Sequence, residues 1–134
     1  MKKVLLITSN DEQLVELARY LGMEGGHDVH GCASLVDALM VLEAFEPDVI
    51  ITDWNVGDHT GDVILEQLVG YCQTSCHSKP VAITIYGEDQ ITTEVIAAAC
   101  TDPTLAIKID FVLKDKKIGP NLLQLIAQAQ PSDA

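Results

Sequence analysis

The sequence predicts one α/β domain in which five parallel strands alternate with five helices. Three observations indicate this fold class. Apolar runs and amphipathic helical patterns alternate five times along 134 residues, a length typical of a single domain. Several of the apolar runs are continuous, as in strands buried on both faces of a parallel sheet. Hydrophobic residues make up 48% of the chain, enough to fill a core of this size without disulfides or metals.

The five strands are expected where short apolar runs are bounded by turn or polar residues. The first follows two lysines, the second follows the turn Gly25-Gly26, and the third follows Pro47. The fourth follows Pro80, and the fifth lies in a lysine-rich stretch. The strands are expected at residues 4–8, 28–32, 49–52, 81–85 and 109–113. No internal repeat, low-complexity segment or interdomain linker interrupts this order.

Five helices are expected after these strands, each indicated by an apolar face, a capping residue or both. Ser9 or Asn10 can cap the first helix, and Ser34 opens a capping box at the second. Thr60 can cap the third helix, and Pro120 lies in the first turn of the last one. The helices are expected at residues 11–23, 34–44, 60–71, 90–100 and from 119 onward, with residues 72–79 as a loop.

The chain is acidic, with 20 acidic residues, 8 basic residues and a net charge of -12. This charge argues against a broad nucleic-acid interface, because phosphate contacts require lysine and arginine. It also disfavours anionic membranes and is compatible with a basic protein partner. The apolar run after Lys2-Lys3 is too short for a signal peptide, and no segment is long enough to span a membrane. A cytoplasmic protein with reduced cysteines is therefore expected.

Four polar side chains end strand-like runs of the predicted sheet. They are Asn10, Asp53, Thr84 and Lys114. Five such units usually form a sheet of order 2-1-3-4-5, with helices on both faces. The carboxyl ends of its strands meet at the edge where open α/β sheets bind ligands. We therefore expect the four side chains to lie close together, and an acid beside a hydroxyl and a lysine suggests phosphate chemistry on the acid.

The order of these residues resembles the receiver domain of two-component response regulators, the CheY-like family with a flavodoxin-like fold. Asp53 and Gly61 match one part of the pattern, Thr84 a second and Lys114 a third. The matching segments are residues 53–61, 83–87 and 110–114, together with residues 38–39 and 46–51. The resemblance covers one domain at residues 1–130, and residues 131–134 are expected to form a disordered tail.

The resemblance implies that Asp53 attacks the phosphorus of a phosphohistidine on a partner kinase and forms an acyl phosphate. A Mg²⁺ ion would neutralise charge and align the transferring group. Its implied ligands are Asp53, the backbone carbonyl of Asn55, and either Asn10 or Asp11. Any enzymatic activity would be limited to the protein's own phosphorylation and dephosphorylation.

The resemblance also implies catalytic roles for Thr84 and Lys114. Lys114 would contact the phosphate as a point charge, and the Thr84 hydroxyl would hydrogen-bond a phosphoryl oxygen and shift inward. Phe111 would follow as the aromatic switch, although it equally suits an ordinary core position. The added charge would bias the face formed by the fourth helix, fifth strand and fifth helix. The implied partners are a sensor histidine kinase or phosphotransfer protein and a downstream protein target, and a homodimer could form through that face.

Two departures separate the chain from the usual receiver pattern. Ser9-Asn10 replaces two adjacent acids that hold the metal, so weakened Mg²⁺ affinity is expected. Asp11 is the next acid along the chain, and it is either a substitute ligand or a first-turn acid stabilised by the helix dipole. Asp115 replaces a proline that usually follows a cis bond, so the loop at Lys114 can take another path.

Three functions remain open. The first is a stand-alone receiver that accepts a phosphoryl group on Asp53 and signals by protein docking. The alternative is a phosphate-independent pseudo-receiver that acts as a protein-interaction module. A flavodoxin-like ligand-binding domain is more distant, because the loop after the first strand lacks the expected glycine. Zinc binding is disfavoured too, because Cys72, Cys76 and His77 lack a second ligand pair at the usual spacing.

Overall fold

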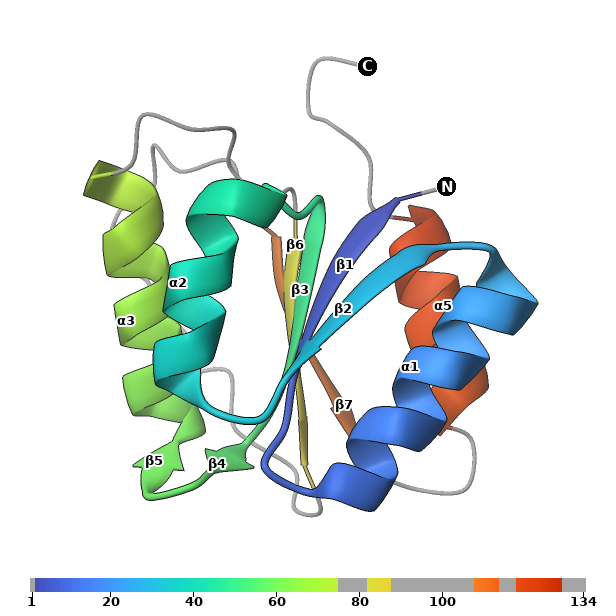
Figure 1. The fold of residues 1–134 in the computed structure, drawn as a ribbon, viewed down its shortest axis with the longest axis horizontal. Helices are drawn as coiled ribbons and strands as arrows, with labels where there is room; N and C mark the ends of the chain where they lie inside the picture. Colours follow the sequence, from blue (N-terminus) through green and yellow to red (C-terminus); the bar gives the residue numbers. More distant parts are fainter. Residues whose placement is uncertain (1, 75–81, 88–107, 114–117, 129–134) are drawn as a thin grey trace.

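A computed structural model of the chain describes residues 2–74, 82–87, 108–113 and 118–128. Within them, five strands form one parallel sheet in the order β2-β1-β3-β6-β7 (Figure 1). These strands are β1 (Lys3–Ile7), β2 (Asp28–Cys32), β3 (Val49–Asp53), β6 (Ala82–Gly87) and β7 (Lys108–Leu113). The α/β class and the predicted order 2-1-3-4-5 are therefore confirmed, with β6 and β7 as the fourth and fifth main strands.

Helices cover both faces of the sheet (Figure 1). One face carries α1 (Asp11–Gly25) and α5 (Ile118–Gln128), and the other carries α2 (Leu35–Phe45) and α3 (Gly61–Thr74). The predicted helix at 90–100, the start of the fourth strand at residue 81 and the tail at 131–134 lie outside the described residues. No helix in the described ranges is long and apolar enough to cross a membrane.

Two core layers hold the helices to the sheet. The strands bury both faces because their side chains alternate between the layers. The first layer joins β-strand residues such as Ile50 and Ile83 to α2 and α3. The second joins Leu6, Ile51 and Tyr86 to α1 and α5. Each described helix therefore buries its apolar face in one of the two layers, α2 and α3 in the first and α1 and α5 in the second.

The predicted caps of the first two helices are present. The Asn10 side chain accepts a hydrogen bond from the Gln13 backbone N–H at 3.1 Å, and the Ser34 hydroxyl accepts one from the Asp37 N–H at 3.2 Å. Each bond satisfies one of the donors that a helix leaves free at its start. Gly26 ends α1 with a φ of 64°, a left-handed conformation that glycine adopts without strain.

Several predicted boundaries were wrong. The first strand ends at Ile7, one residue early, and β6 continues to Gly87, two residues past the predicted end. Helix α3 continues to Thr74, so Cys72 is helical instead of beginning a loop, because no breaker residue follows the apolar face. A small hairpin, β4 (Asn55–Val56) and β5 (His59–Thr60), occupies the loop before α3 and was not expected. Its turn places Gly57 at a φ of 60°.

Candidate functional site

The candidate site lies at the carboxyl end of β3, where the strand delivers Asp53. The register places Ile7 of β1 beside Thr52, so Thr8 follows on to lie next to Asp53. On the other side, Asp53 is the register partner of Tyr86 in β6. The three central strands therefore bring Thr8, Asp53 and Tyr86 into one row across the sheet.

Asp53 is half-buried, and both of its carboxylate oxygens accept hydrogen bonds. The Thr8 hydroxyl donates to Oδ2 at 3.3 Å, and the Asn55 backbone N–H donates to Oδ1 at 3.4 Å. The same Thr8 oxygen accepts a bond from the Asn10 N–H at 3.2 Å. These contacts orient the carboxylate between the end of β1 and the loop that follows β3.

Tyr86 closes the other side of the site. Its side chain is fully buried, and its hydroxyl donates to Oε1 of Gln13 on α1 at 3.1 Å. Burial raises the pKa of Tyr86 far above its ordinary value; the charge of Asp53 raises it further, whereas a side-chain hydrogen bond with Thr8 opposes the shift. The phenol therefore stays protonated and acts as a neutral hydrogen-bonding group beside the carboxylate.

The predicted position of Thr84 at a strand end was wrong. Thr84 is the third of six residues in β6, where it pairs with Ile51 and Asp110 instead of with Asp53. Its side chain is buried, with 2% exposed. Two residues along a strand correspond to roughly 6.6 Å. Thr84 therefore lies inside the sheet, one full repeat below the carboxylate, and Tyr86 takes the place predicted for it.

Asn10 and Asp11 lie at the start of α1, and no hydrogen bond described between their side chains and Asp53 links them to the site. The Asn10 side chain is exposed and its oxygen accepts the capping bond from Gln13. Asp11 is exposed as the first residue of the helix, where an acid is favoured by the helix dipole. The structure therefore gives both residues a role in starting the helix, and their predicted roles toward a metal stay predictions.

The other predicted site residues are placed in part. Asn55 lies in β4 with its N–H toward Asp53. Phe111 lies in β7, where its backbone pairs with Ile85. Lys114 falls outside the described residues, so the predicted contact between Lys114 and phosphate stays untested.

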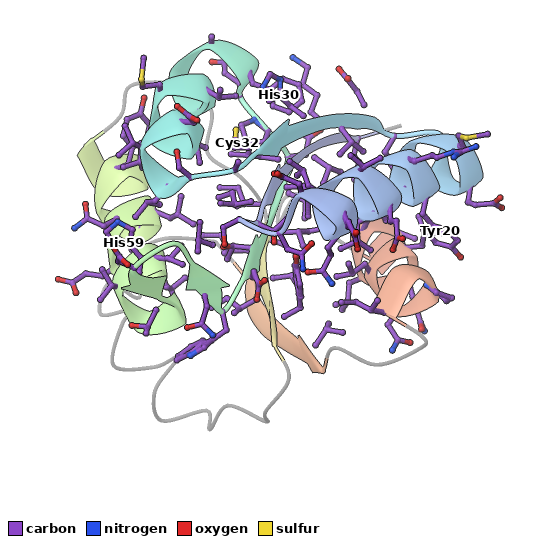
Figure 2. All side chains as sticks on the ribbon, turned by 60° about the horizontal axis from the view of Figure 1, so that its bottom comes forward. Tyr20, His30, Cys32 and His59 are labelled. Carbon is purple, nitrogen blue, oxygen red and sulfur yellow. The ribbon has the colours of Figure 1, made fainter. Side chains whose placement is uncertain are left out.

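Asp53 supplies one carboxylate at this position. The described groups that contact its oxygens, the Thr8 hydroxyl and the Asn55 amide, donate hydrogen bonds to them. Magnesium is usually held by one or two carboxylates with waters and phosphate oxygens, so a weak Mg²⁺ site at Asp53 stays a prediction. The described parts of the chain contain no group of three or more histidine, cysteine or acidic side chains that could hold a metal. Figure 2 shows His30 and Cys32 on β2, apart from His59 on β5.

Gly61, the second residue of the first motif, has a packing role. A Cβ atom built there would lie 2.0 Å from Cε3 of Trp54, so the ring covers the start of α3 at the glycine. The Trp54 backbone N–H donates to the Tyr86 carbonyl at 2.8 Å, which continues the link between β3 and β6. The spacing of Asp53 and Gly61 is therefore explained by the turn that leads from the strand over Trp54 into the helix.

Sequence reasoning missed Thr8, Gln13 and Tyr86 as members of this site. Thr8 is the first polar residue after the apolar run of β1, and it directly precedes Ser9 and Asn10, which the sequence pattern assigned to the site. Tyr86 is the aromatic residue that follows Ile85 in the fourth strand, and the predicted strand ended at Ile85, two residues before the observed end at Gly87. Both signals were present in the sequence, but only the register shows that they flank Asp53.

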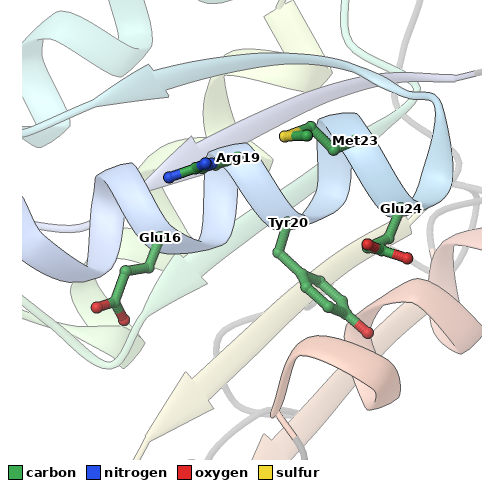
Figure 3. A pocket seen from close by; sticks show the side chains of 5 residues that line it. All are labelled: Glu16, Arg19, Tyr20, Met23 and Glu24. Atoms are coloured by element: carbon green, nitrogen blue, oxygen red, sulfur yellow. The ribbon is translucent and has the colours of Figure 1, made fainter.

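A separate hollow of about 340 Å³ lies along the second half of α1. Its lining residues are Glu16, Arg19, Tyr20, Met23 and Glu24. Figure 3 shows Tyr20 directed toward α5, where its ring lies close to Gly119. None of the residues predicted for the site lines this hollow, so it is a surface feature independent of Asp53.

Comparison with known proteins supports the fold. No protein-family model and no curated protein matches the sequence. The chain is similar to the chemotaxis protein CheY4 of Vibrio cholerae, with a TM-score of 0.74, 17% identity and coverage of 97% of this chain and 99% of that one. A receiver domain from Clostridium thermocellum gives a TM-score of 0.72, 20% identity and coverage of 96% and 94%.

A CheY-like receiver domain from Methanospirillum hungatei is similar to the same degree, with a TM-score of 0.72, 16% identity and coverage of 96% of this chain and 92% of that one. Each similarity spans nearly all of both chains, so it concerns the whole domain and not a shared fragment. The chain therefore has the receiver fold, which confirms the resemblance seen in the sequence. Identities of 16–20% establish the fold and leave the activity to be argued from the site.

Proposed function

We propose that the protein is a signalling module of the receiver fold that docks to other proteins and does not depend on phosphorylation at Asp53. One observation carries this proposal: the described residues around Asp53 supply no second carboxylate. Asn10 stands where a metal-holding acid is expected, and its side chain caps α1. Asp11 is exposed in the first turn of the same helix.

The physical reason is electrostatic. Phosphoryl transfer proceeds mainly by positioning and charge neutralisation, with divalent ions bridging the phosphate oxygens. A lone carboxylate with amide and hydroxyl neighbours attracts such an ion far less than a group of acids does. The receiver fold still offers helix faces for binding, and the net charge of -12 favours a basic surface on the partner.

The second candidate is a phosphoacceptor that receives a phosphoryl group on Asp53 from a histidine kinase or phosphotransfer protein and passes the signal to a downstream protein. The half-buried position of Asp53 at the carboxyl end of β3 favours it, because the carboxylate keeps some access to solvent. In this candidate Mg²⁺ would be held by Asp53, the Asn55 carbonyl and Asn10 or Asp11. Catalytic roles for Thr84 and Lys114 and a switch role for Phe111 depend on it. So does a homodimer through the face formed by the fourth helix, fifth strand and fifth helix.

One experiment separates the two candidates. The protein is titrated with Mg²⁺ at millimolar concentration and then with beryllofluoride, while backbone amide shifts are followed by NMR. The proposed function predicts unchanged shifts at Asp53, Trp54 and Asn55. Saturable shifts that disappear in Asp53→Asn would instead establish the phosphoacceptor. In that case Asp11→Ala tests the substitute ligand, and an unchanged metal affinity would exclude it.

A further inference from the structure

Tyr86 fills the end of the sheet beside Asp53. Its side chain is 0% exposed, and its register partner on β3 is Asp53 itself. Asp53 follows Ile51 by two residues, and Ile51 shares the second core layer with Tyr86. Because strand side chains alternate between faces, the carboxylate and the phenol rise on the same face of the sheet, under α1.

The far end of the phenol is fixed by a hydrogen bond. Its hydroxyl donates to Gln13 Oε1 at 3.1 Å, and the Thr8 hydroxyl separately donates to Asp53 at 3.3 Å. Buried rings in such well-packed positions move only at the cost of their neighbours. The aromatic ring therefore lies between the first turn of α1 and the end of β3, and a rotation that would move it breaks the bond to Gln13.

A phosphoryl group on a carboxylate adds a tetrahedral phosphorus with three strongly accepting oxygens. Tyr86 offers such a group a ring and one hydroxyl that is already committed to Gln13. We propose that Tyr86 determines the ligand selectivity of the Asp53 site, because its ring occupies the room that a tetrahedral anion needs beside the carboxylate. This inference rests on the proposed function, which attributes phosphate independence to the lack of a second carboxylate near Asp53. The Tyr86 ring would add a steric cause to that electrostatic one.

The two causes can be separated with a designed background. Thr8→Asp supplies a second carboxylate where the Thr8 hydroxyl meets Asp53, whereas an aspartate at position 10 would only cap α1. In this background Tyr86→Ala removes the ring, whereas Tyr86→Phe keeps the ring and removes only the hydroxyl. Tyr86→Val, a small residue suited to strands, serves as a second test if the alanine variant does not fold. Amide shifts at Asp53, Trp54 and Asn55 are followed during titration with Mg²⁺ and beryllofluoride.

We expect half-saturation by beryllofluoride at a concentration at least about tenfold lower in the alanine or valine variant than in the phenylalanine variant. Equal responses of the small and aromatic variants, including no response in any, would overturn the proposal. A response of the wild-type protein would count against phosphate independence instead. The comparison among variants at position 86 would still test the role of the Tyr86 ring. A failure of phosphate independence is therefore distinguishable from a failure of the proposal for Tyr86.

Discussion

Replacing Gly61 by alanine should destabilise the protein, whereas the same replacement at Gly70 should stabilise it. Both glycines lie in α3, where alanine is the better helix former. They differ in what the new methyl group meets. At Gly61 it would lie 2.0 Å from Cε3 and 2.4 Å from Cζ3 of Trp54, whereas at Gly70 no atom lies within 4 Å.

The magnitude follows from two opposing terms. Alanine in place of glycine in a helix contributes about 0.8–1 kcal/mol, and this term acts at both positions. Forcing an extra carbon against a packed side chain costs about 1–3 kcal/mol, and this term acts only at Gly61. The Trp54 ring is half-buried against the first core layer, so it can move only partly. We expect a net loss of up to about 2 kcal/mol at Gly61 and a gain of up to about 1 kcal/mol at Gly70.

Urea unfolding gives the test, with midpoints compared at equal slopes. The single tryptophan of the chain is Trp54, so its fluorescence reports directly on the ring that must move. Far-UV circular dichroism provides a second probe that does not depend on the ring. Equal shifts of the two variants in the same direction would refute the argument, because the packing term would then be absent. An emission spectrum of Gly61→Ala identical to that of the wild type would refute it as well.

Three further predictions concern the surroundings of the site and the start of the chain. Asn10→Ala should cost about 1 kcal/mol of unfolding free energy by urea titration, because α1 loses its cap, whereas Asn10→Asp should cost little. Thr8→Val should lower the free energy of unfolding by about 1–2 kcal/mol, more than Thr8→Ser does, because the buried hydroxyl both donates to Asp53 and accepts from the Asn10 N–H. An equal effect of the two variants would exclude the hydrogen bonds as the cause. Burial, together with the charges of the N-terminus and Lys2, lowers the pKa of His27 from its ordinary value of 6.5. Neutral His27 therefore contributes its full stabilisation above pH 6.5, and this stabilisation is lost as the pH falls through the pKa of the folded state. The urea midpoint of His27→Gln should therefore fall less on acidification than that of the wild type.

The fold could be predicted because its signals are local and repeated. Continuous apolar runs such as that of β3 specify strands buried on both faces, and the caps at Asn10 and Ser34 start helices at fixed positions. Parallel strands joined by helices then leave few topologies, since crossovers are right-handed. The hairpin of β4 and β5 was missed because two-residue strands leave no periodic pattern, and only Gly57 marked its turn.

The site was predicted less completely because it depends on register. Asp53 was found from the end of its run, which a polar position and a loop define clearly. The run that contains Thr84 continues through Ile85 and Tyr86 to Gly87, so the hydroxyl of Thr84 does not mark the end of the strand. A motif of ordered residues is compatible with several strand offsets, and packing against β3 and β7 selects one of them.

The offset decides whether Thr84 or Tyr86 lies beside Asp53, and the spacing of residues in the sequence does not show which. A shift of two residues along a strand leaves a side chain on the same face, so the alternation pattern looks unchanged. It nevertheless moves the side chain by roughly 6.6 Å, more than a threonine can reach across. Thr84 and Tyr86 therefore point to the same face of the sheet, but Thr84 lies within the sheet beside Ile51 and Tyr86 lies beside Asp53. Asp53 ends β3 within the receiver fold, and the proposal is that Tyr86, its register partner, takes the space that a tetrahedral anion would need beside it. Exchanging residue 86 alone, in a background that supplies a second carboxylate, thus tests whether the Tyr86 ring limits anion binding at Asp53.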